Sequence, residues 1–197
     1  VDNLAADDEV VIVANSANYA LSTTQNGNNR GQASVTKDNT TKTVTWTGNS
    51  VQVLTLEDGK TSGTWAFYTG SGYLYAASSS KNYLRTETTL SANSSWNITI
   101  ASTGVATIKA TGTNTNNWLR HNSSSSIFSC YSSGQGDVCI YKKVSAGYTI
   151  TYNTNGGTAI DPTTGTKLPN PLPTPTKTGY TFKGWYTSSG IRVEVNT

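Results

Sequence analysis

The sequence is poor in several residue types, and each absence narrows what the chain can be. It contains no methionine, one histidine, two cysteines and only 13% charged residues. It also lacks any stretch of about 18 apolar residues, so no segment is expected to cross a membrane as a helix. In their place stand 34 Thr, 23 Ser and 19 Asn, with 18 Gly and 11 Tyr. Thr and Tyr favour strands, whereas Asn, Gly and Ser favour turns, so the composition excludes a mainly helical protein and predicts an all-β fold.

Charge of either sign is sparse and spread along the chain. Lys and Arg number 14 and Asp and Glu number 11, which gives a net charge of +3. Nucleic-acid-binding proteins concentrate Lys and Arg on one face or in one run. The densest basic cluster here is the pair Lys142 and Lys143. We therefore expect no nucleic-acid partner.

The cysteines and the histidine form no metal-binding pattern. Cys130 and Cys139 lie on either side of Gly134-Gln135-Gly136, and a hairpin there would bring them opposite each other. A disulfide and two free thiols are both open alternatives at this stage. Neither a Cys-x-x-Cys pattern nor a Cys/His cluster is present, so no metal site and no cofactor is expected.

Composition changes once along the chain and divides it in two. All five prolines lie in the last 40 residues, whereas both cysteines precede residue 140. The change falls near residues 144–147, so we expect one domain over residues 1–145 and a second module over residues 146–197. The low charge and the abundance of Thr, Ser and Asn fit a secreted or bacterial cell-surface protein, and the first residue, Val1, fits a processed chain or an excised fragment.

Three internal repeats occupy the first domain. Each begins with a hairpin, in which alternating apolar residues lead into a turn rich in Gly and Asn, and an aromatic residue starts the return strand. The hairpins span residues 10–21, 65–75 and 106–120. Third strands are expected near residues 32–36, 83–87 and 127–131, and fourth strands at residues 51–56, 96–100 and 138–141. Three copies of a four-strand unit give twelve strands within about 140 residues.

A β-trefoil is the fold that this repeat predicts. One four-strand unit cannot bury its apolar face alone, whereas three copies close a six-stranded barrel capped by three hairpins. A β-sandwich is the alternative, because short strands with frequent turns also describe it, but the threefold match favours the trefoil. The side chains expected to share the core are Ala20, Leu74, Leu119, Val53, Ile98 and Ile140.

The last part of the chain carries a motif in two parts. An alternating strand from Tyr148 ends in the turn signal Asn155-Gly156-Gly157, and Gly-Tyr-x-Phe-x-Gly-Trp-Tyr follows at residues 179–186. This pairing resembles the Listeria–Bacteroides repeat, also called the internalin B-repeat, over about residues 147–190. The resemblance implies a small β-grasp-like module that acts as a spacer or adhesive element in bacterial surface proteins. Residues 191–197 depart from the family's closing apolar strand, so a truncated module is expected.

The first domain carries a resemblance of its own. Residues 72–79 together with residues 82–85 resemble a β-trefoil, lectin-like domain found in secreted, multi-domain proteins of gut Bacteroidetes. This resemblance implies the fold and brings no settled activity with it. The Gln-x-Trp motif of ricin-type lectins is absent, since the nearest text is Val51-Gln52-Val53, and the sugar sites of those lectins cannot be transferred.

No catalytic constellation stands out in the sequence. The acidic residues are isolated or form adjacent pairs such as Glu57-Asp58, and no motif recommends a pair for acid–base chemistry. His121 lacks an accompanying Gly-x-Ser-x-Gly elbow, and Gly70-Ser71-Gly72 lacks the following helix that a phosphate-binding loop needs. We therefore predict a protein that is not an enzyme and has no catalytic residues.

The repeats do offer the side chains that bind sugars, which are an aromatic face together with amide, hydroxyl or guanidinium groups. Residues 116–122, which we name the third-repeat run, are the densest such segment, and the side chains of Asn117 and Arg120 are expected on the rim of the domain. Aromatic residues that begin the second strands, Trp118 among them, could instead plug the barrel. The candidate carbohydrate-binding residues are Asn116, Asn117, Trp118, Arg120, His121 and Asn122, with Tyr75 and Arg85 from the second repeat.

Two functions of different classes follow. The first is a non-catalytic carbohydrate-binding module of a secreted or surface multi-domain bacterial protein, with a glycan or polysaccharide as its partner and the parent protein's other domains as further candidates. The alternative is a structural or adhesive spacer segment that binds a protein partner. The trefoil favours the first by analogy alone, because fold does not imply function, and the C-terminal repeat favours the second.

Overall fold

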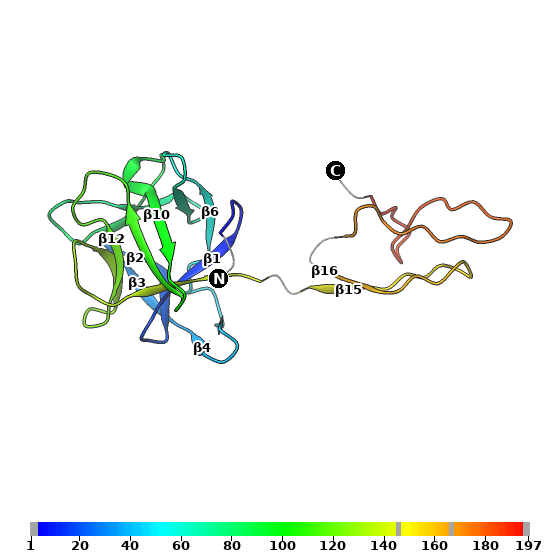
Figure 1. Ribbon diagram of the computed structural model, residues 1–197, viewed down its shortest axis with the longest axis horizontal. Helices are drawn as coiled ribbons and strands as arrows, with labels where there is room; N and C mark the ends of the chain where they lie inside the picture. Colours follow the sequence, from blue (N-terminus) through cyan, green and yellow to red (C-terminus); the bar gives the residue numbers. More distant parts are fainter. Residues whose placement is uncertain (1–3, 145–146, 166–167, 195–197) are drawn as a thin grey trace. The chain divides into compact units, whose positions relative to one another are not determined.

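The computed structural model describes residues 4–144, 147–165 and 168–194. The chain divides into two compact units, Val1–Lys143 and Val144–Thr197 (Figure 1). The expected junction between residues 145 and 146 falls outside the described residues. No helix in the described ranges is long and apolar enough to cross a membrane.

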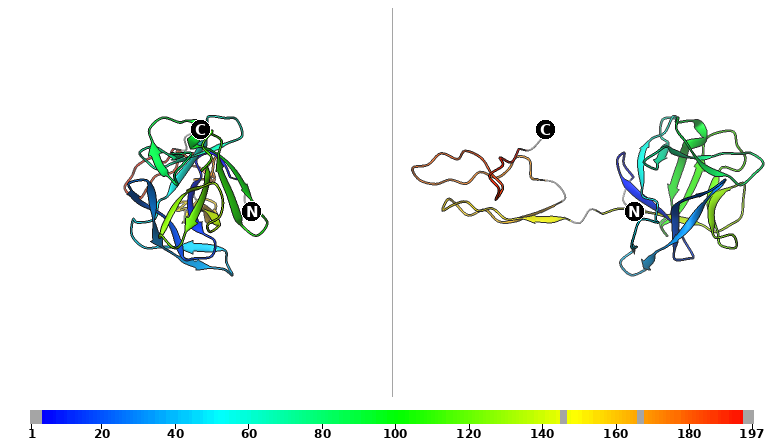
Figure 2. Two further views of the ribbon diagram at one scale, coloured as in Figure 1. Left: turned by 90° about the vertical axis from the view of Figure 1, so that its left-hand side faces the viewer. Right: turned by 180° about the vertical axis from the view of Figure 1, so that it is seen from behind.

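A closed ring of six antiparallel strands forms the barrel of the first unit. Each strand pairs with the next, and the sixth pairs with the first, so the ring has no free edge. Figure 2 shows these strands from two further sides, wrapped around one centre. In ring order they are β1 (Glu9–Ala14), β6 (Leu54–Asp58), β7 (Trp65–Tyr68), β10 (Ser95–Ile100), β11 (Val105–Ala110) and β14 (Val138–Lys142).

Three hairpins complete the threefold pattern. Each hairpin continues from a barrel strand: β1 pairs with β2, β7 with β8 and β11 with β12. The first and third hairpins also pair with each other through β3 and β13. The hairpin strands are β2 (Tyr19–Asn26) with β3 (Asn29–Ser34), β8 (Tyr73–Ala76) with β9 (Leu84–Glu87), and β12 (Trp118–Asn122) with β13 (Ile127–Tyr131).

These twelve strands confirm the predicted all-β fold with an N-terminal β-trefoil. The closed ring rules out the β-sandwich alternative, because a sandwich consists of two separate sheets. Within the described residues, the helical content is a single 3-10 turn, Ala92–Ser94. Its start is capped by the side chain of Ser91, which accepts a hydrogen bond from the Asn93 backbone N–H.

The core contains most of the side chains expected there. Leu74 and Leu119 are fully buried in the barrel core, as predicted, whereas Ala20 is fully buried in a second cluster outside the barrel, which makes its expected place in the core wrong. Ile98 and Ile140 are only partly buried and pack against the edge of the barrel core. The expectation for Val53 is wrong, because it packs with a second cluster outside the barrel. Side chains alternate along a strand, and here the following residues Leu54 and Leu56 face inward.

Strand β1 is buried on both faces, which its sequence of consecutive apolar residues reflects. Val10 and Ile12 point into the barrel core, whereas Val11 and Val13 belong to the second cluster outside it. Between the third and fourth strands of the first repeat, where the four-strand repeat predicts no further strand, lies a short antiparallel hairpin, β4 (Thr36–Asp38) with β5 (Thr43–Thr45). Val44 and Trp46 from this segment pack on the cluster, so the extra length of the first repeat covers the outside of β1. The members of the second cluster are Val11, Val13, Ala20, Ala33, Val35 and Val51, with Val44, Trp46, Val53 and Tyr141 packed against them.

Of the two alternatives for the cysteines, the structure has free thiols. Cys130 on β13 and Cys139 on β14 are both buried and unbonded to each other. Burial raises the pKa of the Cys130 thiol far above its ordinary value. A thiol that stays protonated and buried is unreactive, so these residues serve packing.

The second unit contains a small two-stranded sheet and an aromatic cluster. Strands β15 (Tyr148–Ile150) and β16 (Thr163–Gly165) pair antiparallel. The predicted turn lies between them in the chain, and Asn155 and Gly156 both have positive φ there. The Trp185 ring lies 5.1 Å from that of Tyr152 and 5.3 Å from that of Phe182, measured between centroids. Its indole N–H donates to the Pro173 carbonyl at 2.7 Å, which ties the proline-rich stretch to the motif.

Candidate functional site

Arg120, one of the candidate sugar-binding residues of the third-repeat run, is buried inside the protein, with 8% of its surface exposed. Its Nε and Nη2 donate to the carbonyls of Gly134 and Gln135 at 3.1 and 2.9 Å. Its Nη1 forms an ion pair with Asp137 at 2.5 Å. The guanidinium thus holds the β13–β14 loop closed, and the expectation that Arg120 lies on an accessible rim is wrong.

His121 is also buried, with only 2% of its surface exposed. Its ring lies between Tyr19 and Phe128, at centroid distances of 6.3 and 4.8 Å. Its Nε2 lies 2.8 Å from Gln32 Oε1, and because the two partners belong to β12 and β3, this bond joins the third and first hairpins. Burial lowers the pKa of His121, since the charged imidazolium loses hydration there.

The three asparagines of the run bind within the protein as well. Asn116 donates to Asn82 Oδ1 at 3.3 Å, Asn117 to the Ala110 carbonyl at 3.2 Å, and Asn122 to the Tyr131 hydroxyl at 3.0 Å. The first bond joins the third repeat to the β8–β9 loop of the second, whereas the other two lie within the hairpins of β12. The amide groups of these asparagines therefore already have hydrogen-bond partners within the protein.

Trp118 is half-buried, and two cations lie over its ring. Lys109 Nζ is 4.5 Å and Arg120 Cζ is 4.0 Å from the ring centroid. Cations over an aromatic face are attracted by its negative quadrupole. A sugar ring stacked on the same faces would have to displace them.

Tyr75 and Arg85 stand opposite each other on β8 and β9. Tyr75 is half-buried, whereas Arg85 is exposed. Arg85 donates to Asn28 Oδ1 and lies over the Tyr83 ring at 5.1 Å. The eight candidate residues therefore form two separate groups. Residues 116–122 lie at the β12–β13 hairpin, and Tyr75 and Arg85 lie on the β8–β9 hairpin. The sugar-binding role of all eight residues stays a prediction.

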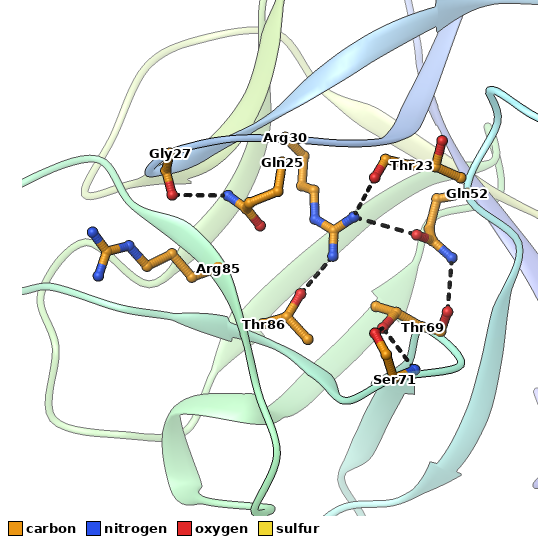
Figure 3. A pocket seen from close by; sticks show the side chains of 9 residues that line it. All are labelled: Thr23, Gln25, Gly27, Arg30, Gln52, Thr69, Ser71, Arg85 and Thr86. Carbon is orange, nitrogen blue, oxygen red and sulfur yellow. Dashed lines mark hydrogen bonds between the residues drawn. The ribbon is translucent and has the colours of Figure 1, made fainter.

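A polar cavity of about 500 Å³ lies where the first and second repeats meet, and we name it the Arg30 pocket (Figure 3). Its volume falls in the range typical of small-ligand sites. It draws on β2, β3 and β9, the β7–β8 turn and a single residue ahead of β6. The lining residues are Thr23, Gln25, Gly27, Arg30, Gln52, Thr69, Ser71, Arg85 and Thr86.

Arg30 points from β3 into the middle of this group (Figure 3). Its Nη1 donates to the Thr23 carbonyl at 3.1 Å and to Gln52 Oε1 at 3.3 Å, and its Nη2 donates to Thr86 Oγ1 at 2.5 Å. The residue is only 5% exposed, and its Nε is buried without a hydrogen-bond partner in the described part of the chain. Burial lowers the pKa of the guanidinium, because nothing offsets its lost hydration.

Neighbouring amides and hydroxyls hold the rest of the lining in place. Gln52 Nε2 donates to the Val53 and Thr69 carbonyls at 2.7 and 3.2 Å. Gln25 Nε2 bridges from the β2–β3 turn to the Leu84 carbonyl at 3.1 Å. That turn needs Gly27 at its φ of +60°, a conformation that other residues rarely adopt. The pocket is therefore preformed by the fold.

Of the predicted site residues, Arg85 alone lines this pocket. Sequence reasoning missed the others because they are scattered over residues 23–86 and meet only when the barrel closes. One signal was present in the sequence: Arg30 is the single charged residue between Glu9 and Lys37. Among the described residues, no group of three or more His, Cys, Asp or Glu side chains is arranged to hold a metal.

Comparison with solved structures places the first unit among β-trefoil folds. The Polyporus squamosus lectin, solved with the human-type influenza-binding epitope Neu5Acα2-6Galβ1-4GlcNAc, matches with a TM-score of 0.51 at 12% identity, over 75% of this chain and 52% of the lectin. The BEL β-trefoil matches with a TM-score of 0.53 at 10% identity, over 72% of this chain and 97% of its own. These likenesses show the fold.

A GlcNAcα1-4Gal-releasing endo-β-galactosidase from Clostridium perfringens also matches, with a TM-score of 0.51 at 10% identity. The match covers 70% of this chain but spans only 33% of the enzyme. No curated protein sequence matches the chain. The family comparison concerns the end of the chain, where residues 148–197 match the Listeria–Bacteroides repeat domain and bear out the resemblance seen in their motif.

Proposed function

We propose that the first unit is a non-catalytic carbohydrate-binding domain and that the Arg30 pocket is its binding site. The observation that carries this proposal is the chemistry of the lining, which consists of hydroxyl, amide and guanidinium groups. Most small-ligand pockets are lined by apolar and aromatic side chains. A lining of hydrogen-bonding groups instead suits a ligand rich in hydroxyls, which is what a sugar is.

The fold supports the proposal without deciding it. A lectin is among the solved structures that share the trefoil, although one fold hosts many functions. The third-repeat run remains a second candidate site for the same function. Its Trp118 indole N–H is buried without a partner in the described part of the chain. Arg120, His121 and the three asparagines already have internal partners, so a glycan there would exchange existing hydrogen bonds for new ones, which yields little net free energy.

A glycan array with the full chain tests whether the protein binds carbohydrate. A variant whose Arg30 pocket is blocked then tests whether binding takes place there. Ser71 is exposed in the β7–β8 turn at the pocket's edge, so Ser71→Trp should fill the opening while leaving the core intact. We expect glycan retention to fall at least tenfold. Ser124→Trp, in the exposed β12–β13 loop, is the matched control and should bind as the parent chain does.

The second candidate function is a spacer or adhesive segment that binds a protein partner at a bacterial surface. The observation that favours it is the exposure of Tyr148, Tyr180, Phe182 and Tyr186 in the second unit, at 50, 73, 37 and 54%. Exposed aromatic residues are common in protein interfaces. Periodate oxidation destroys sugar rings, so a target surface that still binds the chain after periodate treatment favours this candidate over glycan binding.

A further inference from the structure

The charge in the Arg30 pocket is of one sign only. Two of its lining residues are arginines and the other seven are neutral. Two acidic side chains on neighbouring strands, Glu87 and Glu57, are engaged elsewhere. Glu87, which follows Thr86 on β9, accepts from the Ser91 hydroxyl at 2.5 Å. Glu57 on β6 accepts from the Tyr73 hydroxyl at 2.9 Å.

Arg30 and Arg120 provide a comparison within the same domain. Both are buried, with 5 and 8% of their surface exposed. Arg120 has a carboxylate partner in Asp137, whereas the ion pairs in the described residues do not include Arg30. The acceptors of Arg30 are a carbonyl, an amide oxygen and a hydroxyl. A buried cation without an opposite charge is costly and is uncommon unless something compensates for it.

We propose that the Arg30 pocket binds an acidic sugar of a glycan, with the sugar's oxyanion, a carboxylate or a sulfate ester, neutralising the charge of Arg30. This inference rests on the proposed carbohydrate-binding function. The guanidinium has five N–H donors, three of which are used by the protein, so donor capacity remains for an oxyanion. Charge-assisted hydrogen bonds from arginine to such groups are roughly twice as strong as neutral ones.

The surroundings of Arg30 suit such a ligand. Gln52 and Thr86 fix the guanidinium plane, so little side-chain freedom is lost when the ligand binds. Arg85 lies at the other side of the pocket with its guanidinium turned away from Arg30 (Figure 3), and it supplies a second positive charge. The hydroxyls of Thr23, Thr69 and Ser71 also line the pocket. Thr69 Oγ1 donates to the Gly72 carbonyl at 2.9 Å, and Ser71 Oγ lies 3.3 Å from Thr69 Oγ1, so these hydroxyls offer a sugar their remaining acceptor positions.

The test compares matched acidic and neutral polymers on the full chain. Polygalacturonic acid and its methyl ester share one backbone and differ in the charge of the carboxylate, and dextran sulfate and dextran differ likewise in sulfate. We expect at least a tenfold higher affinity for one acidic polymer over its neutral counterpart, and the pair that shows it identifies the oxyanion. Inorganic sulfate, added at the concentration of the polymer's acidic units, should compete little.

Charge-removing variants place the effect in the pocket. Arg30→Gln is the direct variant, and Arg85→Gln is the second, because Arg85 is exposed and its loss leaves the core intact. We expect Arg85→Gln to weaken acidic-polymer binding at least threefold, and by a larger factor than it weakens neutral-polymer binding. Lys60→Gln removes the same charge from an exposed position outside the pocket and should leave both affinities unchanged.

Each contrary result has its own meaning. Equal affinity for the acidic and neutral members of both pairs would overturn the acidic-sugar inference and leave sugar binding standing. Equal loss in Lys60→Gln and Arg85→Gln would reduce the preference to non-specific attraction and overturn it too. Full competition by inorganic sulfate would mean that a free anion is the ligand. Failure to bind any glycan would overturn the proposed function itself.

Discussion

The third-repeat run and the Arg30 pocket contain the same kinds of side chain but use them differently. In the run, Arg120, His121 and the asparagines are bonded to carbonyls, amides, a hydroxyl and a carboxylate of the protein, and the Trp118 indole N–H is the group buried without a partner in the described residues. In the pocket, Arg30 is held by neutral groups and lacks an opposite charge. The comparison teaches that a dense polar run in a sequence can be a structural network. A binding site is better marked by polar groups that the fold leaves partly unsatisfied.

The strongest test of this contrast is Arg120→Ala. It removes an ion pair and two hydrogen bonds to the β13–β14 loop and leaves Asp137, Gly134 and Gln135 without their partner. We expect a loss of about 2–4 kcal/mol in the free energy of unfolding, below the cost of breaking a fully buried pair because Asp137 is 45% exposed. Urea denaturation measures it. A variant that keeps its stability but no longer binds glycan would return the site to the third repeat.

Arg30→Met should behave in the opposite way. Arg30→Met removes the hydration cost of a buried charge that has no carboxylate partner, and it also removes three hydrogen bonds to neutral acceptors, so the two changes offset each other. We expect the free energy of unfolding to change by no more than about 1 kcal/mol. Glycan affinity should fall at least tenfold, which corresponds to about 1.4 kcal/mol of binding free energy. Titration calorimetry beside urea denaturation separates the two effects. If Arg30→Met unfolds the domain as Arg120→Ala does, the two arginines have the same structural role.

Most of the fold could be predicted from the sequence, because strand alternation and turn signals are local. All twelve strands of the trefoil lie where the threefold repeat indicates, and Leu74 and Leu119 fill the core. The β4–β5 hairpin was missed, since its short strands are polar and gain their place by covering β1. Which face Val53 presents was also misjudged, because a one-residue shift in register reverses the face of every side chain.

The candidate site was far harder to predict, because it depends on contacts between distant residues. Gln52 and Thr86 lie 22 and 56 positions from Arg30 along the chain, and their hydrogen bonds to Arg30 form only after the first two repeats pack together. Likewise, the sequence around Arg120 does not predict its ion pair with Asp137, which lies 17 positions further along the chain. Local pattern shows which side chains are available, and tertiary structure decides which of them are already occupied.

A smaller effect sharpens the role of the groups that orient Arg30. Thr86→Val is nearly isosteric and removes the hydroxyl that accepts from Arg30 Nη2 at 2.5 Å. With one support lost, the guanidinium gains freedom that binding must then restrict, and we expect affinity for the acidic polymer to fall by about 1 kcal/mol, roughly fivefold. Thr107→Val on β11, outside the pocket, serves as the control. An unchanged affinity would show that Arg30 is positioned well enough without Thr86.

The smallest effect concerns pH and again separates the two regions. Burial lowers the pKa of His121 in the folded state below its ordinary value of 6.5, so the unfolded chain binds the proton more tightly. Stability should therefore decrease as pH falls below about 6.5 toward the lowered pKa, and be fully present above 6.5. His121 is the one histidine of the chain, so His121→Gln should remove this slope from urea denaturation series between pH 5 and 7. Carbohydrate affinity should stay constant over the same range, because the pocket's titratable residues are arginines, which remain charged. If affinity instead followed the His121 titration while stability did not, the histidine would belong to the binding site, and the third-repeat run would regain the role that the sequence first suggested.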